Sequence, residues 1–169
     1  DVDVERKCLL IGLAGGLFTR VMELYPVDVT AVEIDLKVAE IARAYFGYRG
    51  RIYYPDGEEH VTEPSRFPRP QGPGDMHPEP TVAPASPRRY LGRTVIEDGR
   101  RFLESSIERY DFIVLDAYSS DVIPSHLVTR EMFRSACRHL TDEGILAINY
   151  IGRPSGDAVT ESLARTLQD

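Results

Sequence analysis

Short apolar runs alternate with amphipathic segments along most of the chain. The short runs are rich in β-branched residues, and we expect a strand in each. The longer segments place apolar residues three and four positions apart, which is the spacing of one helix face. Strands are expected at residues 7–11, 28–33, 93–97, 112–116 and 144–150. Helices are expected at residues 17–25, 36–46, 100–108, 129–140 and 157–167, and Asp35 is the expected N-cap of the second helix.

Strands that alternate with helices form βαβ units, which have parallel strands and right-handed crossovers. We therefore predict an α/β fold, with a three-layer, doubly wound, mostly parallel sheet of the Rossmann-like type. The five strands are expected in the spatial order 3-2-1-4-5. Residues 1–169 are predicted to form a single nucleoside-binding domain. The pattern starts on a strand and stops after a helix, so we expect the sequence to be truncated at both ends.

Residues 55–92 interrupt the alternation. The part at 55–87 holds nine of the 12 prolines of the sequence and has no apolar periodicity. Proline lacks a backbone donor and disfavours helices and central strands. We expect an insertion that lies outside the core as an irregular surface loop. Its PxxP stretches leave a second interpretation open, in which the segment binds a partner protein.

The composition is that of an ordinary globular domain, with 42% hydrophobic and 28% charged residues. Acidic residues outnumber basic ones by 27 to 20, giving a net charge of −7. A dedicated nucleic-acid binder usually has a basic domain, so we expect no nucleic-acid partner. The negative charge mildly favours cationic ligands.

No apolar run is long enough to span a bilayer, and the acidic start is unlike a secretion signal. We therefore expect no membrane segment and a cytoplasmic location, either as a free protein or as the soluble domain of a membrane-associated one. Cys8 and Cys137 are far apart and form no CxxC motif. We expect both to be buried as apolar side chains, with neither a disulfide nor a metal site.

Four chemistry-bearing positions follow predicted strands: the glycine-rich turn at 12–16, Glu33, Asp98 and Asp116. Ligands of parallel α/β sheets bind at the carboxyl ends of the strands. Because all four positions fall at such ends, we predict a nucleoside site there. Their coincidence carries more weight than any one position alone.

The first two positions suit the backbone and sugar of a nucleoside. The small residues Gly12, Ala14 and Gly16 let a ligand lie against the chain, and the helix that follows offers free N–H groups. The carboxylate of Glu33 can accept both hydroxyls of a ribose. Two structural interpretations stay open: a packing turn for the glycines and a solvated acid for Glu33.

The other two acids suit a base and a reacting group. Asp98, followed by Gly99, can accept from the exocyclic amine of a purine, or it can cap the helix that starts at residue 100. Asp116 closes the most apolar strand and is the candidate catalytic residue. In the loop that follows, Tyr118, Asp121 and His126 are candidates for substrate contact, with a purely structural role as the alternative for each.

The order of four segments carries a family resemblance: residues 12–16, Val32-Glu-Ile-Asp35, Asp98-Gly-Arg-Arg-Phe102 and Asp111-Phe-Ile-Val-Leu-Asp116. Together they resemble the spermidine synthase-like family, within the class I S-adenosylmethionine-dependent methyltransferase superfamily. Residues 116–131 resemble its bacterial spermidine-synthase-like branch. The similarity covers residues 7–48 and 93–150.

The resemblance implies a transferase of polyamine biosynthesis. Such an enzyme binds S-adenosylmethionine or its decarboxylated form and transfers an aminopropyl or methyl group to a small-molecule amine. It implies that Glu33 holds the ribose, that Asp98 meets the adenine amine, and that Asp116 is the acid beside the reacting amine. The methionine-like part of the cofactor would lie along Gly12, Ala14 and Gly16. A homodimer is also expected.

One difference from the family keeps alternatives open. Gly15 stands where the synthases have an Asp that would hold an amine. This favours a methyltransferase with another acceptor. A non-catalytic nucleoside-binding module of a larger protein is a further alternative. Nicotinamide-dependent oxidoreduction is a distant one, against which the positions of Asp98 and Asp116 argue.

Overall fold

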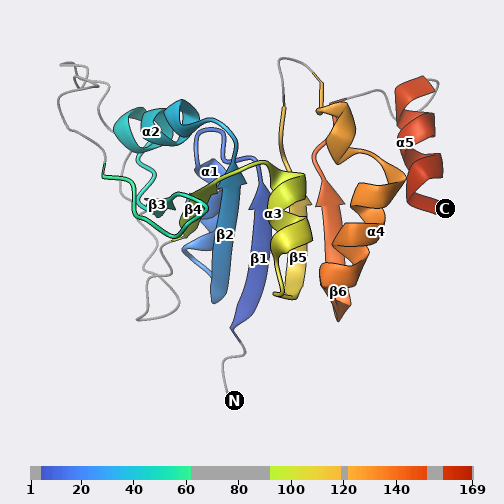
Figure 1. The fold of residues 1–169 in the computed structure, drawn as a ribbon, viewed down its shortest axis with the longest axis horizontal. Helices are drawn as coiled ribbons and strands as arrows, with labels where there is room; N and C mark the ends of the chain where they lie inside the picture. Colours follow the sequence, from blue (N-terminus) through green and yellow to red (C-terminus); the bar gives the residue numbers. More distant parts are fainter. Residues whose placement is uncertain (1–4, 62–91, 119–121, 152–157, 169) are drawn as a thin grey trace.

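The computed structural model describes residues 5–61, 92–118, 122–151 and 158–168. In this part of the chain, one sheet is flanked by helices (Figure 1). The strands are β1 Arg6–Ile11, β2 Val27–Glu33, β3 Arg51–Tyr53, β4 Arg93–Ile96, β5 Tyr110–Leu115 and β6 Leu140–Ile148. The helices are α1 Leu17–Met22, α2 Leu36–Tyr45, α3 Gly99–Ser105, α4 Arg130–His139 and α5 Ala158–Gln168, with a 3₁₀ turn at Ser125–Leu127.

The sheet has the order β3-β4-β2-β1-β5-β6, and each pair of neighbouring strands is parallel. The order predicted for the five expected strands is confirmed, since these are β1, β2, β4, β5 and β6. The prediction missed β3, which adds an edge strand. This strand has only three residues and ends shortly before Pro55, so it leaves no recognisable alternation.

Two apolar cores, one on each face of the sheet, make the fold three-layered. Alternate residues of β1 serve the two cores: Cys8 and Leu10 pack on the α1 and α2 side, Leu9 and Ile11 on the opposite side. The second core also takes in Leu103 of α3 together with residues of α4. A strand buried on both faces must be apolar throughout, which explains the continuous apolar run of β1.

Local sequence sets where several helices begin and end. The Asp35 carboxylate accepts from the backbone N–H of Lys37 at 2.9 Å, so the predicted cap of α2 is confirmed. Helix α1 ends at Met22 rather than at residue 25. Pro26 disfavours the helical conformation at the residue before it, and this limits how far the helix extends. Helix α3 ends at Ser105 instead of residue 108, because the backbone of Ser106 is extended.

The first residues of the proline-rich insertion form a turn that pairs with β3. The backbone N–H of His60 donates to the carbonyl of Ile52 at 2.7 Å, and Tyr53 forms a bridge with Glu59. This short part is therefore more regular than predicted. Residues 62–91 lie outside the described residues, so most of the predicted insertion is not described.

The two cysteines differ in environment. Cys8 is 1% exposed, and burial raises the pKa of its thiol to about 12, so it behaves as an apolar side chain. Cys137 is exposed on α4, and the prediction that it is buried is wrong. The apolar stripe of α4 instead buries Met132, Phe133 and Ala136. None of the helices described is long and apolar enough to cross a membrane.

Candidate functional site

A cavity of about 580 Å³ lies at the carboxyl ends of the central strands. This volume is typical of a small-molecule site. The structure places eight of the predicted site residues in its lining: Gly12, Ala14, Glu33, Asp98, Gly99, Asp116, Tyr118 and His126. Gly16 is not in the lining, and Asp121 lies outside the described residues.

The carboxylate of Glu33 is held by two backbone donors. Its Oε2 accepts from the N–H of Leu13 at 3.1 Å, and its Oε1 accepts from the N–H of Asp35 at 3.0 Å. The residue is only 8% exposed. Each carboxylate oxygen has two lone pairs, so one on each remains for a ligand. Glu33 therefore connects the glycine-rich turn to the end of β2 and can still accept two hydroxyls.

Packing also explains why glycine is required at two positions of the turn. At Gly12, with a φ of +99°, a Cβ would lie 2.4 Å from the carbonyl oxygen of Asp116. At Gly16, with a φ of +72°, a Cβ would lie 3.0 Å from Tyr48. Gly12 thus lets two strand ends approach closely at the cavity, whereas Gly16 turns the chain into α1 beside Tyr48.

Asp98 caps α3 and also pairs with His126. Its Oδ1 accepts from the N–H of Arg101 at 3.0 Å, and its Oδ2 lies 2.8 Å from Nε2 of His126. Partial burial alone would raise the pKa of the Asp98 carboxyl. The Arg101 N–H and the His126 ring outweigh that effect and hold the pKa below its ordinary value. Asp98 therefore does cap the helix, as one of the two interpretations predicted. An adenine amine would have to share the Asp98 carboxylate with His126.

Asp116 lies beside Asn149, which follows β6. The amide Nδ2 of Asn149 donates to Oδ1 of Asp116 at 2.7 Å. The backbone carbonyl of Asn149 accepts from the hydroxyl of Tyr118 at 2.5 Å. The Asp116 backbone N–H donates to the carbonyl of Ile11 at 2.8 Å. The residue is thus held through both its backbone and its side chain.

Sequence reasoning missed two residues of this site. Glu97 lines the cavity directly after β4, and its carboxylate pairs with Arg101 at 3.2 Å. Its position after a strand is the same signal that singled out the other acids. Asn149 was placed inside the last predicted strand, although the structure ends β6 at Ile148. A polar amide after an apolar run was the available signal.

The cavity is acidic. Four of its lining residues carry carboxyl groups, namely Glu33, Glu97, Asp98 and Asp116. Among its described lining residues there is no lysine or arginine, and His126 is the one basic side chain. Apolar side chains such as Val32 and Leu127 form other parts of the wall. Such a lining fits a planar base, a sugar with hydroxyls and a positively charged group, which are the parts of an adenosyl sulfonium.

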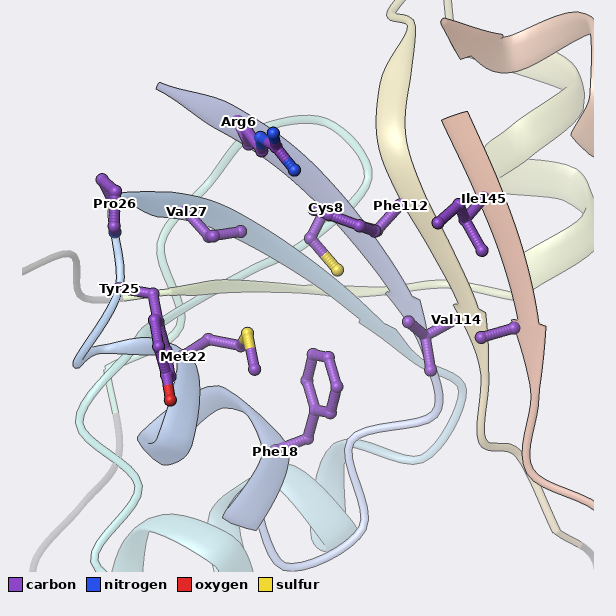
Figure 2. Close-up of a pocket in the computed structure, with 11 residues that line it drawn as sticks. Arg6, Cys8, Phe18, Met22, Tyr25, Pro26, Val27, Phe112, Val114 and Ile145 are labelled. Carbon is purple, nitrogen blue, oxygen red and sulfur yellow. The ribbon is translucent and has the colours of Figure 1, made fainter. Parts of the chain in front are cut away.

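A separate apolar cavity of about 500 Å³ lies on the α1 side of the sheet. Phe18 and Met22 face Cys8, Phe112 and other strand residues across it (Figure 2). Its described lining includes none of the predicted site residues and no carboxylate, so this lining does not share the chemistry of the acidic cavity.

Comparison with known proteins places this geometry in context. No protein-family model matches the chain. The polyamine aminopropyltransferase of Vibrio vulnificus is 30% identical over 145 residues, which is 85% of this chain and 37% of that protein. The predicted spermidine synthase-like resemblance is confirmed. This chain spans about a third of the length of the first curated relatives that it matches.

Solved structures agree on the fold of this chain. Human methyltransferase-like protein 13, solved in complex with SAH, matches with a TM-score of 0.65 at 20% identity. The match covers 98% of this chain and 62% of that one. The spermidine synthase of Thermotoga maritima matches with a TM-score of 0.60 at 20% identity, over 97% and 44%. The class I methyltransferase fold is therefore confirmed.

Proposed function

We propose that this chain is the adenosyl-binding domain of a transferase that moves an aminopropyl or methyl group from a sulfonium cofactor to an amine. The acidic cavity at the carboxyl edge of the sheet is the observation that carries the proposal. Carboxylates attract both a sulfonium and an ammonium, and they repel the pyrophosphate of a dinucleotide. The cavity therefore argues for an adenosyl sulfonium and against a nicotinamide cofactor. The cofactor is S-adenosylmethionine or its decarboxylated form.

The cofactor roles follow from the residues around the cavity. Glu33 accepts the ribose hydroxyls with its remaining lone pairs. Asp98 accepts from the adenine amine, in competition with His126. Gly12 and Ala14 leave room for the chain that carries the sulfur. Each role matches a residue type and a place at a strand end.

For this reaction the protein must remove a proton from the amine and align the amine with the cofactor. Either cofactor, when bound, supplies an activated carbon: its bond to the amine nitrogen forms while its bond to sulfur breaks, and sulfur keeps the electron pair as a thioether. A free alkylamine has a pKa of about 10.4, so its neutral form costs about 4–5 kcal/mol at pH 7. Asp116 stabilises the ammonium on arrival and accepts its proton. Alignment beside the cofactor supplies much of the remaining rate.

Aminopropyl transfer is the first candidate activity. The curated relatives support it, because the Vibrio protein and three others carry the name of a polyamine aminopropyltransferase. Gly15 is the observation that favours methyl transfer, since it removes a carboxylate that would hold the far end of a diamine. One relative, from Emericella nidulans, is named an N-terminal histidine N-methyltransferase, which supports transfer of a methyl group to nitrogen as the second candidate.

Calorimetry tests the cofactor first. We expect S-adenosylmethionine or its decarboxylated form to bind and NAD to give no heat above that of dilution. Incubation with a diamine then identifies the reaction by mass spectrometry. Aminopropyl transfer leaves 5′-methylthioadenosine, and methyl transfer leaves S-adenosylhomocysteine. Binding of NAD alone, or of none of the three, contradicts the proposal. Binding without either product excludes a diamine as the acceptor and leaves two alternatives, a methyltransferase with another acceptor and the non-catalytic module.

A further inference from the structure

Asn149 is the only asparagine of the sequence, and it lies next to Asp116 at the ends of two paired strands. Strands β5 and β6 are parallel, with Leu115 opposite Ile148. The next residues in this register are Asp116 and Asn149. The N–H of Asn149 continues the ladder by donating to the carbonyl of Leu115 at 2.9 Å. The backbone therefore fixes the place from which the Asn149 side chain reaches Asp116.

The amide of Asn149 uses one oxygen of the Asp116 carboxylate. Nδ2 donates to Oδ1 at 2.7 Å. No described residue donates a hydrogen bond to Oδ2. The backbone carbonyl of Asn149 accepts from the hydroxyl of Tyr118, which lines the same cavity. The side chain of Asn149 thus holds the carboxylate, while its backbone holds a neighbouring polar side chain.

We propose that Asn149 is a positioning residue that fixes the Asp116 carboxylate with Oδ2 left to receive the amine. The proposal rests on the transfer to an amine inferred above. A neutral amide suits this task better than a lysine or an arginine. It orients the carboxylate without adding a positive charge that would repel the arriving ammonium. It also leaves two lone pairs on Oδ2 for the amine.

The effect of this restraint should appear in the rate rather than in cofactor binding. Without the amide, the Asp116 side chain can take other rotamers, and a displacement of about 1 Å at a reacting group costs up to about 10²-fold in rate. Asn149 does not line the cavity among its described residues, so the cofactor should bind as before. The expected signature is a lower kcat with an unchanged cofactor affinity.

Two variants of Asn149 and one matched control test the proposal. Asn149→Leu removes the donor and keeps the approximate shape, and we expect kcat to fall about 10- to 100-fold. Asn149→Gln keeps an amide and should recover most of that loss. Thr141→Val is the control. The Thr141 hydroxyl donates to Oδ1 of Asp111 at 3.2 Å, at the opposite ends of the same two strands. This variant should keep the wild-type kcat.

A spectroscopic readout separates this proposal from the proposed function. Selective ¹⁵N-asparagine labelling gives a single side-chain amide, because the sequence has one asparagine. We expect one of its two protons to be shifted downfield and protected from exchange in the wild type, and the shift to be lost in Asp116→Ala. This measurement needs no cofactor, so it stands even if no transfer is detected.

Each result has a defined meaning. A shifted amide proton, a lower kcat in Asn149→Leu and recovery in Asn149→Gln support the proposal. An amide signal that is the same in the wild type and in Asp116→Ala overturns it. So does an Asn149→Leu protein with the wild-type kcat, or an equal loss in Thr141→Val. Should Asn149→Leu fail to fold, the amide signal and the Asn149→Gln variant decide.

Discussion

Nε2 of His126 lies 2.8 Å from Oδ2 of Asp98, so the carboxylate that we propose for adenine already has a partner within the chain. A purine amine must compete with that imidazole. We expect His126→Ala to tighten the binding of adenosine-containing ligands about fivefold, the value of a hydrogen bond of about 1 kcal/mol. Calorimetry measures the change. The same substitution in an Asp98→Ala background should have no effect, and weaker binding by the single variant would mean that His126 contacts the ligand itself.

The lowered pKa of Asp98 predicts how stability depends on pH. A carboxyl group with a lowered pKa in the folded state adds stability above its unfolded pKa of about 4. That contribution is lost as the pH falls through the lower, folded value. Asp98→Asn keeps a cap for α3 but loses the charge that faces His126. Urea unfolding should therefore show the wild type to be more stable above about pH 4, with the difference disappearing in stronger acid. A difference that grows toward low pH would contradict this assignment.

Glu33 both stabilises the fold, through its two backbone hydrogen bonds, and lines the cavity, so its replacement should affect stability and ligand affinity. In Glu33→Gln, the side-chain NH2 group replaces one carboxylate oxygen. It faces the backbone N–H of Leu13 or of Asp35 and cannot accept a hydrogen bond from it. We expect the free energy of unfolding to fall by about 1–3 kcal/mol and nucleoside affinity to fall about 10- to 100-fold. Glu104→Gln is the control, because that exposed acid pairs with Arg100 on α3 and does not line the cavity among its described residues. Unchanged affinity in a folded Glu33→Gln protein would remove Glu33 from the site.

The glycines of the turn should differ in what they tolerate. A Cβ at Gly15 would make ordinary contacts with Phe46 at 3.5 Å, whereas one at Gly12 would clash with the Asp116 carbonyl. We expect Gly15→Asp to change the free energy of unfolding by less than about 0.5 kcal/mol. Gly12→Ala should cost at least about 1–3 kcal/mol. Gly15→Asp also supplies the carboxylate that the family has there, so diamine affinity should rise. Equal stability losses in thermal unfolding, or no gain for a diamine, would contradict this account.

Much of the fold could be predicted because the apolar pattern of each segment agreed with the place of that segment in the parallel sheet. The apolar run of β1 is buried on both faces, and that of β5 is buried on one face and partly buried on the other. Both runs can therefore be recognised as strands from the sequence alone. The acids at 33, 98 and 116 could be assigned to one edge because parallel strands end there together. A strand of three residues such as β3 leaves no such pattern.

Side-chain partners could not be predicted from the sequence. That His126 reaches Asp98 depends on the path of the loop after Asp116, which has no periodicity. That Asn149 meets Asp116 depends on the register between β5 and β6. The exposure of Cys137 shows a related failure, since an apolar stripe does not determine how wide the buried face of a helix is.

The Asp116→Asn variant gives the most direct test of the central claim, that this carboxylate serves transfer to an amine. Asn keeps the shape of Asp but cannot accept a proton. The measurement is the single-turnover rate of thioether formation, with enzyme in excess over bound cofactor and with saturating amine, in the wild type and the variant. We expect the variant to bind the cofactor normally and to lose about 10²- to 10⁴-fold in rate. A folded variant that forms the thioether at the wild-type rate would contradict the account.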